Sequence, residues 1–335
     1  MKSNPKTLLI SANDEKKIFK NNLSYAVDIV EYALKKDAAK DTFLPDKISY
    51  IIDNSIQNRI NCMPAALLSD KLYGVKVVSV FPENPKKDYR NVTGTTILSD
   101  LSYGHTLSIM DSGYLTDIRT AAVGATAAKY LSKKDSESIG FIGAGQQARR
   151  HLDIIMTVRH NIKKCYVSSR TDNTVQKFIE EEKILHPDLE FINCENNYEQ
   201  AVINSDIIVT AISGQADLLK AKWIKNGALY IHVAGLEDEY AVSLSASKIV
   251  CDQWDNVKHR TQTISRMYKE GILRYKDIYG NLVDIVTNKI KGRENDEEFI
   301  YFCSVGLAFI DVAFAKYVYE NAQELKLGTK FAFNW

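Results

Sequence analysis

Apolar residues change their spacing along the chain, and this change separates two regions. Up to residue 117, short apolar runs alternate with Asn-Pro, Gly-Thr and Ser-Gly turn pairs, which is typical of strands. Residues 24–36 are the exception, because their apolar side chains repeat at helical spacing. The predicted strands of this region are 47–52, 75–80, 95–99 and 105–110.

From about residue 138 onward, the pattern repeats strand, short turn and helix. Apolar runs predict six strands, whose sequences are SIGFIG, KCYVSS, EFINC, DIIVTAI, ALYIHVAG and KIVCD. Segments with helical spacing lie between them, such as 147–159 and 173–185. This alternation predicts an α/β fold in which a doubly wound parallel sheet carries helices on both faces.

Two further helices complete the predicted organisation. The alanine-rich segment 117–131 is expected to join the two regions, and 305–325 is expected to form a last amphipathic helix. We therefore predict a parallel-sheet domain over 118–305. A smaller α+β domain is expected to combine 1–117 with 306–335.

The composition fits a globular protein and excludes several functions. The 335 residues, 45% hydrophobic and 25% charged, suffice for two domains. A net charge of +1 gives no field that attracts nucleic acid or an anionic membrane, and no apolar run approaches the roughly 20 residues of a membrane helix. The N-terminus lacks the pattern of a secretory signal. The five cysteines form no Cys-x-x-Cys pair, so we predict no metal site and a cytoplasmic, reduced protein.

A glycine motif follows the first strand of the parallel region. Residues 139–142 lead into Gly143-x-Gly145-x-x-Ala148 and then directly into a helix. In such a unit, the first glycine permits a tight turn, the second lets the backbone approach a pyrophosphate, and the alanine lets helix and sheet pack closely. The helix N-terminus adds free N–H groups for the phosphates. A plain strand-to-helix loop is the alternative, but the context favours a Rossmann-type dinucleotide site.

The end of the next strand indicates which dinucleotide is bound. Enzymes that prefer NAD usually place a carboxylate there, which binds the ribose hydroxyls and would repel a 2′-phosphate. Here Ser169 stands at the tip, and Arg170 and Thr171 follow. Because a guanidinium binds phosphate or stacks on adenine, we predict NADP(H) over NAD(H). The alternative is that Arg170 is a solvated loop cation.

Three cations of the first region are candidates for a carboxylate pocket. Lys76 lies inside an apolar strand, where a lysine is costly unless it is paired. Arg119 stands at the head of the alanine-rich helix, and Arg59 directly precedes residues 60–64, Ile-Asn-Cys-Met-Pro. Several such cations beside a nucleotide fold suggest a carboxylate site, although each alone fits a structural ion pair.

Glu237 is a candidate acid or base. It follows the strand ALYIHVAG, at the edge of a parallel sheet where substrates bind. A carboxylate at this position can exchange a proton with an amine or with water. The alternative is a structural carboxylate that caps free N–H groups at the start of a helix.

Several short motifs recur together in one known family. They are NCMPA at 61–65, GVK at 74–76, RTAA at 119–122, IGAGQQA, the VAG turn before Glu237 and the run from Gly292 to Asp311. Over nearly its whole length the chain resembles the ornithine cyclodeaminase/μ-crystallin family. The resemblance implies nicotinamide-dependent hydride transfer at a carbon that bears nitrogen and a carboxylate.

Within the family, the chain is most similar to siderophore enzymes that release 2,3-diaminopropionate and 2-oxoglutarate. Three alternatives remain: a ketimine or pyrroline-carboxylate reductase, an ornithine cyclodeaminase, or a non-catalytic NADPH-dependent binder of a small ligand. Asn61 stands where the cyclodeaminases have a glutamate, so the distal ammonium of ornithine would lose an anionic partner.

The resemblance also implies roles for individual residues. Lys76 or Glu237 is expected to handle the proton, and Lys47, Lys76 and Arg119 are expected to bind the substrate carboxylate. The full set of predicted substrate-binding residues is Lys47, Arg59, Met63, Lys76 and Arg119.

The remaining expectations concern the cofactor and partners. We expect a small amino-acid-like carboxylate as substrate, with residues 53–61 and 81–92 shaping its distal end. We expect a homodimer formed by the smaller domain, because members of the family pair these sheets. The predicted cofactor contacts are Thr120, Gly143, Gly145, Gln146, Gln147, Ala148, Ser169, Arg170, Thr171, Thr210, Ala211, Ile212, Val233, Gly235, Ser304 and Gly306.

Overall fold

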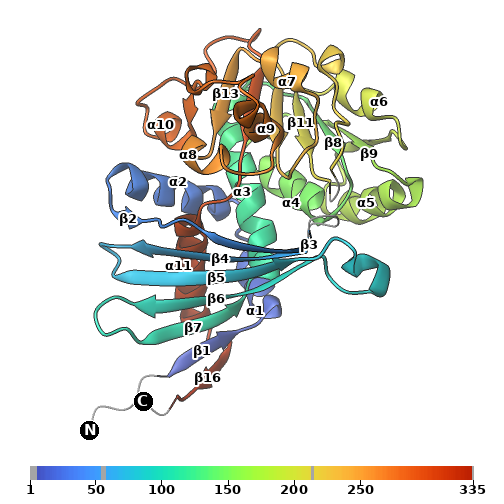
Figure 1. Ribbon diagram of the computed structural model, residues 1–335. Coiled ribbons are helices and arrows are strands. Elements are labelled where there is room, and N and C mark those ends of the chain that lie inside the picture. Colours follow the sequence, from blue (N-terminus) through green and yellow to red (C-terminus); the bar gives the residue numbers. More distant parts are fainter. Residues whose placement is uncertain (1–5, 54–57, 213–214, 334–335) are drawn as a thin grey trace. The chain divides into compact units, whose positions relative to one another are not determined.

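The computed structural model describes residues 6–53, 58–212 and 215–333 (Figure 1). Contacts between Cα atoms divide the chain into two units: unit 1 is Met1–Arg119 with Leu307–Trp335, and unit 2 is Thr120–Gly306. The domain boundaries expected after residues 117 and 305 lie within two residues of this division. Residues 54–57, part of the segment expected to shape the distal end of the substrate site, lie outside the described residues.

Unit 2 contains an eight-stranded parallel sheet, which confirms the predicted α/β fold of Rossmann type. The order of the strands is β10-β9-β8-β11-β12-β15-β13-β14. Their bounds are β8 (Ser138–Ile142), β9 (Lys164–Ser168), β10 (Glu190–Asn193), β11 (Ile207–Thr210), β12 (Leu229–His232), β13 (Lys248–Cys251), β14 (Gly280–Asn281) and β15 (Ile300–Cys303).

All six strands predicted in this region are present, and two strands were missed. The short edge strand β14 contains a glycine and no apolar residue. Strand β15 is fully buried and inserts between β12 and β13, although it follows both in sequence. Its four-residue apolar run directly follows an acidic loop. Because no predicted helix precedes this run, the alternation of strands and helices did not indicate a strand here.

The helices of unit 2 fall between the strands, as the alternation predicted. Helix α4 ends at Ile155, earlier than expected, and β-branched Thr157 and Val158 follow soon after. The bounds are α4 (Gln146–Ile155), α5 (Asp172–Leu185), α6 (Tyr198–Ile203), α7 (Tyr240–Leu244), α8 (Trp254–Val257), α9 (Thr263–Lys269) and α10 (Leu282–Val286), with 3-10 turns at Ala221–Trp223 and Tyr275–Asp277.

Strand order reverses at β8, and this reversal locates a ligand site. Strands β9 and β10 lie on one side of β8, and β11 and β12 lie on the other. In open sheets of this type, ligands bind outside the carboxyl ends of the strands at the reversal. The loops that begin at Gly143 and Ala211 lie there.

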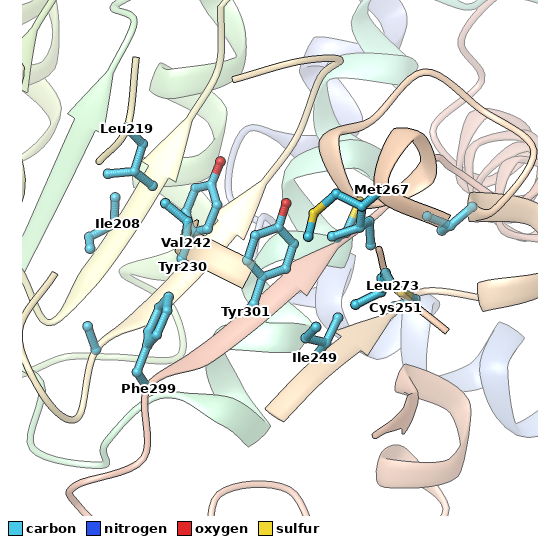
Figure 2. Close-up of a cluster of buried hydrophobic side chains, with 14 of the residues drawn as sticks. Ile208, Leu219, Tyr230, Val242, Ile249, Cys251, Met267, Leu273, Phe299 and Tyr301 are labelled. Atoms are coloured by element: carbon cyan, nitrogen blue, oxygen red, sulfur yellow. The ribbon is translucent and has the colours of Figure 1, made fainter. Parts of the chain in front are cut away.

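A cluster of buried side chains supports the half of this sheet that contains β11, β12, β13 and β15. Figure 2 shows Tyr230 of β12 beside Tyr301 of β15. The centroids of these two rings are 5.0 Å apart, and the rings pack edge to face. Met267 and Trp254, from helices α9 and α8, are buried in the same cluster. Each such side chain contributes roughly 2 kcal/mol by leaving water, so this half of the sheet is a rigid support for its loops.

Unit 1 contains a second, mainly antiparallel sheet. Its order is β16-β1-β7-β6-β5-β4-β2, and β3 also pairs with β4. The four predicted strands correspond to β3, β5, β6 and β7. The bounds are β1 (Thr7–Ile10), β2 (Thr42–Phe43), β3 (Ile48–Asp53), β4 (Asn58–Leu67), β5 (Leu72–Val80), β6 (Val92–Asp100), β7 (Thr106–Asp111) and β16 (Thr329–Phe331).

Strand β4 was not predicted, and Pro64 in its interior argues against a central strand. The structure resolves this conflict by pairing one edge of β4 in two pieces. Strand β3 pairs with β4 as far as Cys62, whereas β2 pairs from Ala66 onward. Pro64 therefore falls where neither short strand requires an N–H donor.

One face of the unit 1 sheet is covered by helices. Helix α11 (Ala308–Glu324) packs on β4, β5 and β6, and α1 (Ala12–Phe19) and α2 (Tyr25–Ala38) pack on α11 (Figure 1). Helix α3 (Gly113–Leu131) begins four residues earlier than predicted and runs through the division between the units. A 3-10 turn occupies Asn84–Lys87. Within the described residues, no helix has the length and apolar character that spanning a bilayer requires.

Candidate active site

The turn between β8 and α4 has the geometry of a phosphate-binding loop. Gly143 has φ +102°, and a Cβ there would lie 2.5 Å from the carbonyl oxygen of Ala211, so only glycine fits. Gly145 caps α4 without a side chain, and a Cβ built on it meets no heavy atom within 4 Å. The first N–H groups of a ten-residue helix thus border open space, which fits a dinucleotide pyrophosphate.

The end of β9 presents a cation rather than a carboxylate. Ser168 is buried and donates its hydroxyl to the carbonyl of Phe141, while the N–H of Ser169 donates to the carbonyl of Glu195. Arg170 is exposed, and within the described residues no hydrogen bond or ion pair involves its side chain. Thr171 caps α5. Arg170 is therefore available to an anionic ligand at this edge.

Glu237 is completely buried, and its two oxygens connect the loops after β11 and β12. Oε2 accepts hydrogen bonds from the hydroxyl of Thr210 (2.8 Å) and the N–H of Ala234 (2.9 Å), and Oε1 accepts from the N–H of Ile212 (2.9 Å). These contacts favour the structural alternative named for Glu237, a carboxylate that holds free N–H groups. Its predicted proton exchange gains no support from them.

His232 lies next to Glu237 in a buried polar network that the sequence did not indicate. Its Nε2 donates to the carbonyl of Gly235 (2.6 Å), so in the neutral ring Nδ1 accepts from the hydroxyl of Tyr301 (2.7 Å). Asp238 accepts from the hydroxyl of Thr263 (2.6 Å), and burial raises the pKa of this carboxyl. The network fixes the loop that contains Val233 and Gly235.

The end of β15 is held in a similar way. Asp252 accepts hydrogen bonds from the N–H groups of Val305 (2.8 Å) and Gly306 (2.9 Å). Gly306 has φ +81°, a conformation that glycine adopts without strain. Except for Thr120, which is partly buried in α3, all predicted cofactor residues lie at the carboxyl ends of parallel strands in unit 2.

In unit 1, two of the predicted substrate-binding cations meet at one carboxylate. Lys76 Nζ lies 2.5 Å from Asp311 Oδ1, and Arg119 Nε lies 3.0 Å from the same oxygen. The exposed fractions of the Lys76, Arg119 and Asp311 side chains are only 2%, 10% and 4%. Burial lowers the pKa of Lys76 to about 8, with a further decrease from Arg119, and Asp311 opposes both effects.

The other predicted substrate residues lie on neighbouring strands. Met63 is buried and is the register partner of Lys76. Lys47 directly precedes β3, whose first residue pairs with Cys62, so Lys47 is level with Met63 in the sheet. Arg59 shares the face of Met63 but lies four residues away, about 13 Å along the strand. The structure therefore groups Lys76, Arg119 and Met63, with Lys47 level with them and Arg59 farther off.

A separate cluster of titratable groups joins α4 and α5. His186 Nε2 lies 3.0 Å from Asp153 Oδ1 and 4.0 Å from Glu182 Oε2. Burial, followed by the charge of Asp153, raises the pKa of Glu182 to about 8. Arg149 and Arg150 contact these carboxylates, so the cluster is an ion-pair network between two helices.

The fold and the glycine turn, together with the relatives described below, identify the chain as an oxidoreductase that uses a nicotinamide dinucleotide. It belongs to the ornithine cyclodeaminase/mu-crystallin family, whose model matches residues 13–326. This match confirms the family resemblance drawn from the motifs.

Relatives with named activities agree with this class. A Delta(1)-pyrroline-2-carboxylate reductase of Bacillus cereus is 30% identical and aligns over 97% of this chain and 100% of its own. N-((2S)-2-amino-2-carboxyethyl)-L-glutamate dehydrogenase of Staphylococcus aureus is 27% identical over 97% of this chain and 98% of its own. The solved Delta(1)-pyrroline-2-carboxylate reductase of Thermococcus litoralis, in complex with NADH and L-proline, has a TM-score of 0.90 and 32% identity. It covers 96% of this chain and 99% of its own.

Proposed function

We propose that the protein transfers a hydride between a nicotinamide and a substrate carbon that bears both nitrogen and a carboxylate, in the direction of imine reduction. The observation that carries this proposal is the buried pair of Lys76 and Arg119, which share one carboxylate and retain an excess positive charge. A small anionic substrate would neutralise that charge. Family membership supplies the nicotinamide chemistry.

Each participant has a defined task in this reaction. The reduced dinucleotide supplies a hydride when bound, and the imine carbon accepts it while the nitrogen takes up one proton, which gives the amine and the oxidised dinucleotide. Arg119 binds and orients the carboxylate, which positions the adjacent carbon. Lys76 provides the proton, because a pKa of about 8 leaves it protonated but acidic enough at neutral pH.

Lys76 is a better candidate for the proton than Glu237. The Glu237 oxygens already accept hydrogen bonds from two backbone N–H groups and the Thr210 hydroxyl. These bonds occupy both oxygens, so neither is directed at a substrate. Glu237 therefore serves to position the loops after β11 and β12.

Substitution of Lys76 tests the proposed mechanism. Lys76→Met should lower kcat/KM at least about 100-fold, because both a proton donor and a carboxylate ligand are lost. Dinucleotide binding, measured by nicotinamide fluorescence, should stay within about twofold of wild type. The surface variant Lys129→Met serves as control. A Lys76→Met enzyme with substantial turnover would contradict the assignment.

For the cofactor, we propose NADP(H) over NAD(H), supported by the exposed Arg170 and the absence of an acidic residue at the tip of β9. Arg170→Ala should weaken NADPH binding about tenfold or more and change NADH binding little, because only NADPH offers the 2′-phosphate. Titration of both dinucleotides into both proteins measures the preference. An unchanged ratio of dissociation constants would overturn this proposal.

For the substrate, a cyclic imine such as Δ1-pyrroline-2-carboxylate is the first candidate, since both pyrroline-2-carboxylate reductases compared are more similar than the dehydrogenase. The second candidate is N-((2S)-2-amino-2-carboxyethyl)-L-glutamate, favoured by the full-length match to its dehydrogenase. A panel of both compounds, ornithine and L-proline with each dinucleotide separates them. Only the second yields a 2-oxo acid, and only a cyclodeaminase yields ammonia without net cofactor change.

We also propose a homodimer formed through unit 1. The sheet face opposite α11 contains several exposed apolar side chains on adjacent strands. They are Ile48 and Tyr50 on β3 and Tyr73 and Val77 on β5, the two strands that flank β4. An apolar face of this kind is costly to leave in water and marks a protein interface.

A further inference from the structure

Asp311 is a buried carboxylate at the end of the motif that begins at Gly292. It lies in the first turn of α11, where a negative charge is favoured by the helix dipole. Both of its cation contacts use Oδ1, whereas Oδ2 is buried and has no hydrogen-bond partner among the described residues. A buried carboxylate oxygen without a hydrogen bond lowers the stability of the fold, so we take this arrangement to indicate a functional role for Asp311.

The contacts of Arg119 show what this arrangement leaves available. Asp311 Oδ1 lies 3.0 Å from Nε, in an ion pair that includes no hydrogen bond. Across the described part of the chain, the two terminal nitrogens of Arg119 form no hydrogen bond. These two nitrogens are the fork that binds a carboxylate in a bidentate manner.

We propose that Asp311 is a positioning residue for the substrate carboxylate, because it holds Lys76 by a hydrogen bond and offsets the charge of Arg119 near Nε, while the terminal nitrogens of Arg119 remain for the substrate. This inference rests on the proposed function. Two cations with one internal carboxylate leave one net positive charge, which matches one substrate carboxylate. Without Asp311 the two buried cations would repel each other, and Lys76 would lose its proton more easily.

The variant Asp311→Asn keeps the shape of the side chain and removes its charge. The assay measures kcat/KM against pH, with NADPH and Δ1-pyrroline-2-carboxylate as the probe. We expect the alkaline limb of the profile, where activity falls with rising pH, to move to lower pH by about one unit. The variant's loss of kcat/KM relative to the wild type should therefore be about tenfold greater at pH values above this limb than at pH values below it. A uniform loss at every pH, or an unmoved limb, would overturn the inference.

Two further variants separate this role from a general loss of stability. Asp206 also bridges two lysines, Lys133 (3.2 Å) and Lys225 (2.8 Å), but it lies in unit 2 at the start of β11. Asp206→Asn should therefore lower stability without moving the alkaline limb. Asp311→Glu retains the charge and should keep the limb in place, even if Asp311→Asn does not fold; a shifted limb in this variant would contradict the inference.

A double-mutant cycle tests the same coupling without turnover. Asp311→Asn should lower the denaturation midpoint more in the wild type than in Lys76→Met, and the difference should shrink as pH rises above about 8, where Lys76 loses its proton. Additive effects would overturn the inference. A wild type inactive on the whole panel contradicts the proposed function, whereas an active enzyme with an unmoved limb contradicts the role of Asp311 alone.

Discussion

Burial leaves one ionisable residue of this chain charged, Lys76, and makes another neutral, Glu15. Lys76 is buried beside a carboxylate, so it stays a cation near neutral pH while its pKa falls to about 8. Glu15 in α1 is also buried, but both of its oxygens have no hydrogen-bond partner among the described residues. Burial, followed by the charge of Asp111, raises the pKa of Glu15 to about 9. Glu15 is therefore protonated in the folded state.

Glu15 should make stability depend on pH. Its pKa is 4.5 unperturbed and about 9 when folded, so the native state holds an extra proton between these values and stability falls as pH rises through this window. Glu15→Met should remove this slope and raise the free energy of unfolding near pH 8 by on the order of 5 kcal/mol. Denaturant unfolding at several pH values measures the effect. Glu83→Met, at a partly exposed position, is the control; equal slopes in wild type and Glu15→Met would refute the prediction.

At the scale of elements, the two glycines in the turn from β8 to α4 meet different requirements, one of folding and one of the proposed binding. Gly143 has a positive φ and no space for a Cβ, whereas Gly145 has φ −85° and open space in the Cβ direction. The first glycine is therefore needed by the fold. The fold does not require the second, which fits the role proposed for it in binding a phosphate.

Two alanine substitutions test this separation. Gly143→Ala should cost about 1–3 kcal/mol of stability, because the residue is strained and meets the Ala211 carbonyl. Gly145→Ala should change stability by less than about 0.5 kcal/mol and still weaken dinucleotide binding about tenfold or more, since the methyl group occupies the approach of the pyrophosphate. Chemical denaturation and NADPH fluorescence give the two readouts. Wild-type affinity in Gly145→Ala would show that the turn does not bind the phosphates.

At the scale of the whole molecule, the proposed homodimer depends on the uncovered face of the unit 1 sheet. Val77→Asp, at the middle of β5, should weaken self-association about 100-fold, because a carboxylate buried without a partner costs several kcal/mol. Sedimentation velocity should then show a species with the mass of one chain. Ile184→Asp, at an exposed position on α5 of unit 2, should leave the assembly unchanged. If Val77→Asp sediments like the wild type, another surface forms the interface.

The sequence by itself determined the parallel sheet, the glycine turn between β8 and α4, and the family. These features depend on local chemistry: apolar runs, helical spacing, and glycines at positions that a short motif fixes. It also indicated Lys76 and Arg119, because a lysine in an apolar strand is costly unless paired. Strand β4 was missed because the sequence cannot show that β2 and β3 leave a gap opposite Pro64.

Only the tertiary structure decided how the charged groups are paired. Lys76 and Asp311 are 235 residues apart in sequence, and no local pattern relates them; the packing of α11 on β5 brings them together. The hydrogen bonds of Glu237 depend likewise on two loops that only the sheet places side by side. Charge and burial act over a few ångströms in space, so the role of an ionisable residue depends on neighbours that the order of residues does not reveal.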